Sequence, residues 1–381
     1  MRLALIIPCL LAFAASALAV ESTGHPTLPL GSAAPDFRLP GVDGKTYSLA
    51  DFAAAKVLVV LFTSVHCPTA QAYEGRIKQL VIDYGPRGVA FVAINPNNPD
   101  AVRLDEQGFT DLDDTIESMK LRAADRGFNY PFLDDGPTEA VARQYGPAAT
   151  PHVFIFDAAR KLRFKGRIDD SEREGLVKNR DTRNTLDALL ADREPPVTET
   201  MAFGCSIKWA DKAESNRRWR EQVAKEPVAL DPADLAALRD LRANKSGKIR
   251  VINVWATWCG PCVAEFDQLI ETNLIYRNRD FELVTVAAQF PDEKDSVLKF
   301  LQRHHASTRN LIFGETDKYK LMEALDRQPD WDGSLPHTLV LGADGAVLYR
   351  QTGELDFLAL RRALVPALNK LAPWGGLSPV K

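Results

Sequence analysis

The sequence predicts an α/β fold in which one order of strands and helices occurs twice. In each half, a β-rich apolar run leads into a cysteine and then into a helical pattern, at 57–67 and at 249–259. Further along each half, a proline opens another apolar strand at a similar distance from that cysteine, Pro151 in the first and Pro336 in the second. Strands alternating with helices in this way are typical of a central sheet flanked by helices.

Length and composition fit more than one globular domain. The chain has 381 residues, of which 45% are hydrophobic and 26% charged, which excludes a wholly disordered or fibrous protein. The formal net charge of -4 gives no basic footprint for nucleic acid. The sequence also lacks a glycine-rich phosphate loop. We therefore expect neither nucleic acid nor a nucleotide as a partner, and no cofactor.

The first 19 residues predict the compartment. Arg2 precedes an apolar run over residues 3–18, and the segment ends in a small-x-small pattern at Ala17-Leu18-Ala19. This pattern predicts a cleaved signal peptide at 1–19 and an exported protein, periplasmic or extracellular, with an uncleaved membrane anchor as the alternative. Cleavage would also remove Cys9, which lies inside the apolar run.

The first half of the chain has the elements of a β-α-β unit followed by a hairpin and a helix. Its strands are buried on both faces, since their apolar runs are continuous rather than alternating. We expect strands at 57–62, 88–94, 153–156 and 162–164, and helices from Cys67 to Tyr84, at 115–126 and at 182–190.

The second half repeats this order after a charged, proline-rich linker at 193–198. We expect a bridging helix at 209–225, then strands at 249–255, 281–286, 337–341 and 347–350, a helix that opens at Cys259 and a last helix at 357–371. The expected division is a signal peptide at 1–19, a domain at 28–192, a linker with a cysteine-containing tail and a helix at 193–226, and a second domain at 227–372.

The motif Cys259-Gly260-Pro261-Cys262 directly follows the strand at 249–255. A cysteine where a helix begins meets free N–H groups and the positive end of the helix dipole, which favour its thiolate. Cys262, one turn further along, can attack a mixed disulfide formed at Cys259 and release the product. Gly260 and Pro261 keep the turn tight and leave Cys259 accessible. We expect Cys259 to be the attacking cysteine and Cys262 the resolving one.

The run from Trp255 to Cys262 resembles the signature of the thioredoxin superfamily, and the resemblance covers roughly residues 230–370. It implies two tandem thioredoxin folds, each a central mixed sheet flanked by helices, and a supporting position for Trp258. It also implies that Pro336 is a cis proline facing the cysteines, which leaves backbone edges free to pair with a substrate strand.

This motif has other interpretations. Half of a zinc site would need two more ligands, and the sequence has no second CxxC; a static disulfide is the other possibility.

Asn253 stands where cytosolic thioredoxins have a buried aspartate, a pattern more similar to exported TlpA-like thioredoxins. Glu265 lies near the site on the same helix and could assist the cysteines there, but we expect it to be a solvated helix residue. The acidic run at 111–114 is interpreted as helix capping.

The first half retains one cysteine of such a motif, in His66-Cys67-Pro68-Thr69. With the opening segments at 31–37 and 44–49, this run resembles the entry hairpin and the peroxidatic cysteine segment of AhpC/TSA peroxiredoxins. The resemblance implies a redox role for Cys67, a supporting one for His66 and a matching cis proline at Pro151. Two residues of that family have no counterpart: a proline before the cysteine, replaced by Val60, and an arginine.

Cys205 lies just after the last helix of the first half. Peroxiredoxin-like proteins of the redoxin type often carry a cysteine in such a tail, and this resemblance implies that Cys205 is the partner of Cys67 in a reversible disulfide. A stable structural bridge between the two, or a buried free thiol at Cys205, are the alternatives.

The expected function is an exported thiol–disulfide oxidoreductase that uses Cys259 and Cys262, with a second redox site at Cys67. Its partners would be protein disulfides and thiols of the cell envelope and an upstream electron donor. One alternative is a fused thiol peroxidase, in which Cys67 reacts with peroxides and the second domain is the built-in reductant. Another is a non-catalytic module that docks a protein client or holds copper at His66, Cys67 and His152. We expect no metal.

Overall fold

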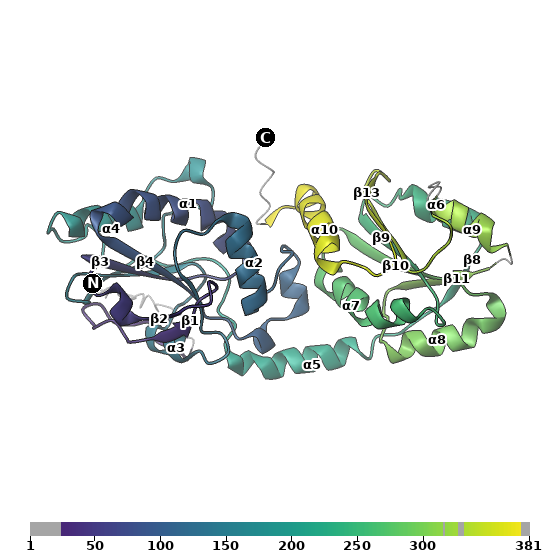
Figure 1. The fold of residues 1–381 in the computed structure, drawn as a ribbon, viewed down its shortest axis with the longest axis horizontal. Helices are drawn as coiled ribbons and strands as arrows, with labels where there is room; N and C mark the ends of the chain where they lie inside the picture. Colours follow the sequence, from purple (N-terminus) through teal and green to yellow (C-terminus); the bar gives the residue numbers. More distant parts are fainter. Residues whose placement is uncertain (1–23, 315–316, 327–330, 375–381) are drawn as a thin grey trace, which may run out of the picture.

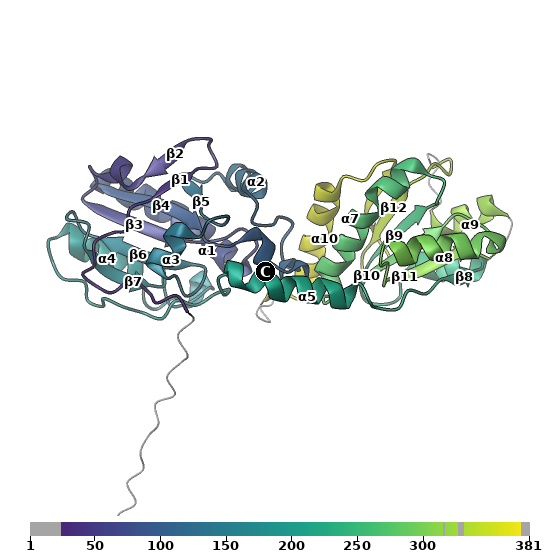
Figure 2. The ribbon, with the colours of Figure 1, turned by 90° about the horizontal axis from the view of Figure 1, so that it is seen from below.

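The computed structural model describes residues 24–314, 317–326 and 331–374, so the leader expected at 1–19 lies outside the described residues. It contains two α/β domains that lie side by side along the long axis of the molecule, bridged by α5 (Ala213–Val223) (Figure 1). The view from below shows the same separation, with α5 running between the domains (Figure 2). Two mixed sheets flanked by helices confirm the predicted fold class.

The first domain is built on a five-stranded sheet of order β5-β4-β3-β6-β7. Strands β3, β4 and β5 are parallel to one another, whereas β6 is antiparallel to both of its neighbours, β3 and β7. A short antiparallel hairpin of β1 and β2 precedes it. The elements are β1 (Arg38–Pro40), β2 (Thr46–Ser48), β3 (Val57–Phe62), α1 (Pro68–Tyr84), β4 (Val89–Asn95), α2 (Ile116–Arg126), β5 (Phe132–Asp134), α3 (Ala140–Tyr145), β6 (His152–Phe156), β7 (Leu162–Gly166) and α4 (Asp181–Leu190).

The central strand β3 is buried throughout because both faces of the sheet are covered. Val57, Val59 and Leu61 pack with α1, α2 and α4 on one face. The alternate residues of β3 point the other way, against α3 and the β1–β2 hairpin. Residues 198–209, which fall in the expected linker, also cover this domain, since Ile207 and Trp209 are buried in the second of these clusters.

The second domain has a six-stranded sheet of order β13-β12-β9-β10-β11-β8, in which β12 and β13 are antiparallel to their neighbours. One face carries α7, α8 and α10, and the other carries α6 and α9 (Figure 1). The elements are β8 (Asp231–Ala233), α6 (Leu235–Ala243), β9 (Ile249–Trp255), α7 (Gly260–Tyr276), β10 (Phe281–Ala287), α8 (Lys294–Arg303), β11 (Arg309–Phe313), α9 (Lys318–Leu325), β12 (His337–Leu341), β13 (Val347–Thr352) and α10 (Phe357–Leu371).

The C-terminal end of α7 contacts the first domain. The Tyr276 hydroxyl donates a buried hydrogen bond of 2.8 Å to the carbonyl oxygen of Thr110. The Arg279 guanidinium lies 3.7 Å from the centre of the Phe109 ring and donates to the Gly108 carbonyl oxygen. These contacts fix the start of α7, where Cys259 lies, at the far end of the helix from the domain interface.

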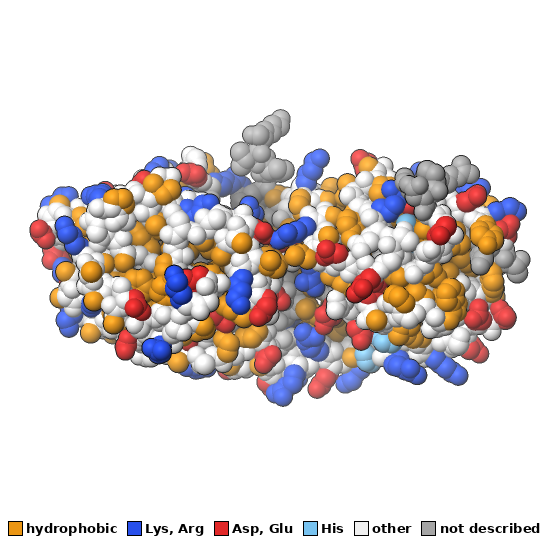
Figure 3. All heavy atoms as spheres, in the orientation of Figure 1, with side chains coloured by type: hydrophobic (Ala, Val, Ile, Leu, Met, Phe, Trp, Pro, Cys, Tyr) orange, Lys and Arg blue, Asp and Glu red, His pale blue; other side chains and the backbone are white. Residues whose placement is uncertain are grey.

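Charged side chains of both signs are interspersed over the face shown in Figure 3, on both domains. Among the described residues, no helix is both long enough and apolar enough to cross a bilayer.

The interdomain hydrogen bond of Tyr276 gives a first prediction. We expect Tyr276→Phe to lower the free energy of unfolding by about 1 kcal/mol, because the buried Thr110 carbonyl loses this donor. The matched control is Tyr47→Phe, whose hydroxyl bonds to Asp43 at the exposed surface and should cost much less. Urea unfolding of both variants measures the difference, and equal losses would contradict a buried contribution from the interface.

Candidate functional site

The second domain places the Cys259-Gly260-Pro261-Cys262 motif at the junction of β9 and α7. Cys259 is the N-cap of α7, and its sulfur accepts a hydrogen bond of 3.3 Å from the Cys262 N–H. The two cysteines form a disulfide with an S–S distance of 2.01 Å. Cys259 is 6% exposed and Cys262 1% exposed, so an incoming thiol or disulfide can reach Cys259 first.

Residues from other elements surround this disulfide. Trp258, just before it, is 67% exposed, which is unusual for so large an apolar side chain. Pro336 precedes β12, which pairs with β9 so that His337 lies opposite Val254. The Leu335–Pro336 peptide bond is cis. Strand pairing therefore brings Pro336 to the end of the sheet at which β9 ends and the turn with Cys259 begins.

Glu265 is buried rather than solvated, which corrects the expectation from the sequence. It lies one turn after Cys262 on α7 and is 7% exposed. Its Oε2 accepts from the Leu355 N–H at 2.9 Å, whereas Oε1 has no hydrogen-bond partner among the described residues. Burial raises the pKa of this carboxyl above its usual value, against the opposing effects of the hydrogen bonds from Leu355 and Asn253. A buried carboxyl thus lies beside Asn253, although Asn253 itself is neutral.

The first domain places Cys67 in the same position, as the N-cap of α1 directly after β3. Its sulfur accepts from the Ala70 N–H at 3.3 Å and lies 3.3 Å from the Thr150 carbonyl oxygen, to which the protonated thiol donates. The Thr150–Pro151 peptide bond is cis, like that before Pro336. Unlike Cys259, Cys67 is fully buried.

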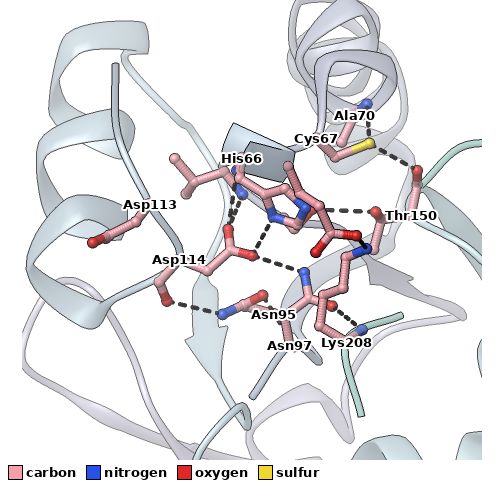
Figure 4. A network of polar contacts seen from close by, with 12 residues as sticks. His66, Cys67, Ala70, Asn95, Asn97, Asp113, Asp114, Thr150 and Lys208 are labelled. Atoms are coloured by element: carbon pink, nitrogen blue, oxygen red, sulfur yellow. Dashed lines mark hydrogen bonds and ion pairs between the residues drawn. The ribbon is translucent and has the colours of Figure 1, made fainter. Parts of the chain in front are cut away.

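A buried ion pair lies behind Cys67. His66 Nδ1 is 2.6 Å from Asp114 Oδ2, and both side chains are almost inaccessible to solvent. Asp114 also accepts hydrogen bonds from the Val65 and His66 N–H groups and from Asn97 Nδ2. Figure 4 shows these groups converging on the Asp114 carboxylate from three directions.

The interpretation of 111–114 as helix capping is wrong for Asp114. The N-cap of α2 is Thr115, whose hydroxyl accepts from the Ser118 N–H, and Asp113 supports this cap by accepting from the N–H and hydroxyl of Thr115. Asp114 instead points into the domain toward His66 (Figure 4). The two adjacent aspartates have the same local sequence signal, so only the chain path that brings loop 63–66 against loop 110–115 separates their roles.

The charges of this pair act on Cys67. Burial lowers the pKa of His66, but the charge of Asp114 and its hydrogen bond raise the pKa more, so His66 favours its cationic form. Burial raises the pKa of the Cys67 thiol, yet the hydrogen bond from Cys205, the charge of His66 and the Ala70 N–H together lower that pKa to about 6. Cys67 therefore favours the thiolate at neutral pH.

Cys205 lies within hydrogen-bond contact of Cys67, and both are free thiols. The Cys67 hydrogen bond, burial and the Cys67 charge all raise the pKa of Cys205 above its ordinary value. The pair therefore consists of one thiolate and one thiol that donates to it. This arrangement can close to a disulfide when an oxidant accepts two electrons.

His152 is held by the fold rather than directed toward Cys67. Its Nδ1 accepts from the Ala148 N–H at 3.0 Å, and burial lowers its pKa to about 3. No cluster of three or more histidine, cysteine, aspartate or glutamate side chains suited to a metal ion occurs in the described part of the chain.

The sequence lacks a counterpart of the peroxiredoxin arginine, and two arginines of the neighbouring helices α1 and α2 form ion pairs with carboxylates. Arg76 lies 2.6 Å from Asp169, and Arg122 lies 2.7 Å from Glu74.

The two cysteine sites do not face each other. Helix α7 has 17 residues, so Cys259 lies roughly 25 Å from the end of the helix that contacts the first domain. Cys67 lies nearer the second domain than most of its own domain does. The hydroxyl of Thr69, two residues after Cys67, accepts a hydrogen bond from Nε1 of Trp374, which follows α10 of the second domain. Direct exchange between Cys259 and Cys67 within one molecule would require the two domains to change their arrangement.

The ion pair behind Cys67 gives a second prediction. Asp114→Asn removes the charge that keeps His66 cationic, so we expect the pKa of Cys67 to rise from about 6 toward the ~8.5 of a free cysteine. The thiolate, formed above pH 6 in the parent protein, would then appear at a higher pH. Thiolate absorbance measured against pH gives the midpoint. Asp113→Asn is the matched control and should leave that midpoint in place; an unshifted midpoint in Asp114→Asn would contradict the role of the pair.

Both halves of the chain are similar to known protein families. Residues 30–165 match the AhpC/TSA family and residues 223–360 match the family described as redoxin. The chain is 32% identical over 146 residues to the thiol:disulfide interchange protein CycY of Rhizobium leguminosarum bv. viciae, a match that covers 38% of this chain and 70% of that protein. It is 28% identical over 148 residues to the thiol:disulfide interchange protein HelX of Rhodobacter capsulatus, which covers 38% of this chain and 73% of that one.

Among solved structures, a hypothetical protein from Sinorhizobium meliloti 1021 is 33% identical, with a TM-score of 0.43, and the match covers 49% of this chain and 97% of that chain. The paired family matches and the relatives named thiol:disulfide interchange proteins confirm the resemblances drawn from the two cysteine motifs. The chain therefore belongs to the thioredoxin superfamily of oxidoreductases, with an AhpC/TSA domain followed by a redoxin domain.

Proposed function

We propose that this protein is an exported thiol–disulfide oxidoreductase that exchanges disulfides with protein clients through Cys259 and Cys262. The observation that carries the proposal is the position of this pair at the start of α7, where the more exposed sulfur, Cys259, is already linked to Cys262. The relatives named thiol:disulfide interchange proteins support the same activity.

The reduced pair would act in two steps. The Cys259 thiolate attacks one sulfur of a client disulfide, which forms a mixed disulfide and releases the other client sulfur as a thiol. Cys262 then loses its proton and attacks the Cys259 sulfur, which releases the second client thiol and forms the Cys259–Cys262 disulfide. An upstream dithiol donor returns two electrons and two protons to the pair. The free N–H groups at the start of α7 stabilise Cys259 each time it leaves as a thiolate.

The surroundings of Cys259 suit a protein rather than a small thiol. Trp258 offers a large exposed apolar surface beside the reacting sulfur. Pro336 lies at the neighbouring sheet edge, where an extended client segment can pair with backbone groups. With the leader expected at 1–19, this points to the thiols and disulfides of envelope proteins as the client class.

Cys67 and Cys205 would form the second redox site. The low pKa of Cys67, the hydrogen bond between the two thiols and the partial exposure of Cys205 beside the buried Cys67 support a reversible disulfide between them. The residues assigned to the two sites are thus Cys259 and Cys262, supported by Trp258 and Pro336, and Cys67 and Cys205, supported by His66, Asp114 and Pro151.

The cysteine pair of the second domain gives a third prediction. Cys259→Ser should abolish the reduction of insulin disulfides, whereas Cys262→Ser should still attack and accumulate as a mixed disulfide with the client, because only the resolving step is lost. Turbidity of reduced insulin and mass spectrometry of the trapped adduct measure the two outcomes. Cys67→Ser is the matched control and should retain most of the activity. Insulin reduction that survives in Cys259→Ser would overturn the proposal.

A second candidate function is a thiol peroxidase at Cys67, favoured by the depressed pKa of Cys67 and by the contact with Cys205. The Cys67 thiolate would attack a peroxide, become a sulfenic acid and release an alcohol or water; Cys205 would then attack that sulfur and release water as the disulfide forms. Because Cys259 is roughly 25 Å from the domain interface, the electrons for the next cycle would come from another dithiol molecule or after the two domains change their arrangement.

Peroxide consumption separates the two candidates and gives a fourth prediction. If the first site is a peroxidase, Cys67→Ser should lose peroxide consumption that is measured with excess dithiothreitol. Treated with peroxide in the absence of dithiothreitol, Cys205→Ser should accumulate a sulfenic acid that reacts with dimedone. Cys259→Ser serves as the control and should consume peroxide at the parent rate under the same reductant. Equal consumption by Cys67→Ser and the parent protein would eliminate the peroxidase function.

A further inference from the structure

Residues 198–209, named the strap here, cross the first domain after its last helix. The strap begins along β7, where the Lys165 N–H donates to the Thr198 carbonyl oxygen and the Thr200 N–H donates to the Lys165 carbonyl oxygen, both at 3.1 Å. The Thr200 hydroxyl also accepts from the Arg167 N–H at 3.0 Å. The strap ends in the core at Trp209. It is therefore anchored to the sheet at one end and buried in the domain at the other.

At its centre the strap pairs with the residue that contacts Cys67. The Thr150 N–H donates to the Cys205 carbonyl oxygen at 3.0 Å, and the Cys205 N–H donates to the Thr150 carbonyl oxygen at 3.3 Å. This is one antiparallel bridge, made beside Cys67. The approach depends on Gly204, which has φ of 144°, and a Cβ there would lie 2.0 Å from the Thr150 carbonyl oxygen.

Beyond Cys205, the strap is linked to the ion pair behind Cys67. The Lys208 N–H donates to Asn97 Oδ1 at 2.9 Å, and the Lys208 carbonyl oxygen accepts from the Asn98 N–H at 2.8 Å. Asn97 Nδ2 in turn donates to Asp114 Oδ2 at 2.7 Å. One amide side chain thus joins the strap to the carboxylate that holds His66, as Figure 4 shows.

In the described part of the second domain, no segment pairs with the backbone at the position that the strap occupies in the first domain. Leu335 precedes Pro336 as Thr150 precedes Pro151, and none of the described residues makes a backbone hydrogen bond to Leu335. Cys259 beside this edge is 6% exposed, whereas Cys67 beside the strap is 0% exposed. The two domains therefore differ at the place where an extended chain can add to the sheet.

We propose that the strap is a built-in substrate strand, which fills the Thr150 edge, presents Cys205 to Cys67 and excludes protein clients from Cys67. This rests on the second redox site of the proposed function. When the strap shifts enough to admit a small disulfide while it still occupies the Thr150 edge, the Cys67 thiolate attacks that disulfide, forms a mixed disulfide and releases one small thiol. Cys205 then loses its proton and attacks the Cys67 sulfur, which releases the second small thiol and forms the Cys67–Cys205 disulfide. The first site would thus take small disulfides and the second site protein disulfides.

The test, a fifth prediction, compares two probes on Cys67. In the full chain with Cys205→Ser, Cys259→Ser and Cys262→Ser, Cys67 is the cysteine left in the described residues. One probe is the small disulfide 5,5′-dithiobis(2-nitrobenzoic acid); the other is a ten-residue extended peptide whose cysteine carries the same leaving group. Release of the coloured thiol gives both rates. We expect the small probe to react much faster than the peptide.

Adding Gly204→Ala should raise the rate with the peptide by at least tenfold relative to the small probe, because the methyl group displaces the strap from Thr150. Thr200→Val, which removes the acceptor for the Arg167 N–H, should act in the same direction and serves if Gly204→Ala does not fold. Gly175→Ala is the matched control, since a Cβ there meets nothing within 4 Å.

Two negative outcomes have different meanings. A peptide that reacts as fast as the small probe in the parent background, or a rate ratio unchanged by both strap variants, would overturn the strap proposal and leave the second redox site standing. A Cys67 that reacts with neither probe in any folded variant would overturn the second redox site together with the strap. Thermal unfolding of each variant establishes that it is folded.

Discussion

Both cysteine sites, at Cys67 and at Cys259, depend on the junction where a buried strand ends and a helix begins with a cysteine as its N-cap. The first N–H groups of a helix have no partners within the helix, and in each domain one of them donates to the capping sulfur, from Ala70 to Cys67 and from Cys262 to Cys259. The strands β3 and β9 fix these junctions because both are buried on two faces. A thiolate at such a position is stabilised by the backbone itself.

The side chains around Cys259 differ from those around Cys67. In the second domain the first cysteine is partly accessible beside the exposed Trp258, and the buried carboxyl of Glu265 lies behind the pair. In the first domain the cysteine is enclosed, and the carboxyl behind it, Asp114, is matched by a histidine. A buried carboxylate is costly without a partner, so the His66–Asp114 pair depends on the hydrogen bonds that the neighbouring loops supply. That requirement ties the electrostatics of Cys67 to the chain segments that cover it.

Helix α7 links the chemistry of the second domain to the arrangement of the two domains. Its first residue follows Cys259, and its last, Tyr276, bonds to the first domain. A helix between these points keeps Cys259 at one end, while the first domain is bound at the opposite end. The domain interface is therefore a structural contact in this arrangement, and each cysteine site has its own surroundings.

The sequence by itself determined the fold class, the family and the positions of the cysteines, because buried strands and helix starts leave local signals; the strands at 249–255 and 337–341 and the helix at 357–371 have the predicted bounds. Elements of three residues such as β5 and β8 were missed, since so short a run has no periodicity. Only the tertiary structure decided that Asp114 meets His66 and that Gly204 lets the strap reach Thr150. These contacts join segments far apart in the chain, and no local pattern encodes which of them meet.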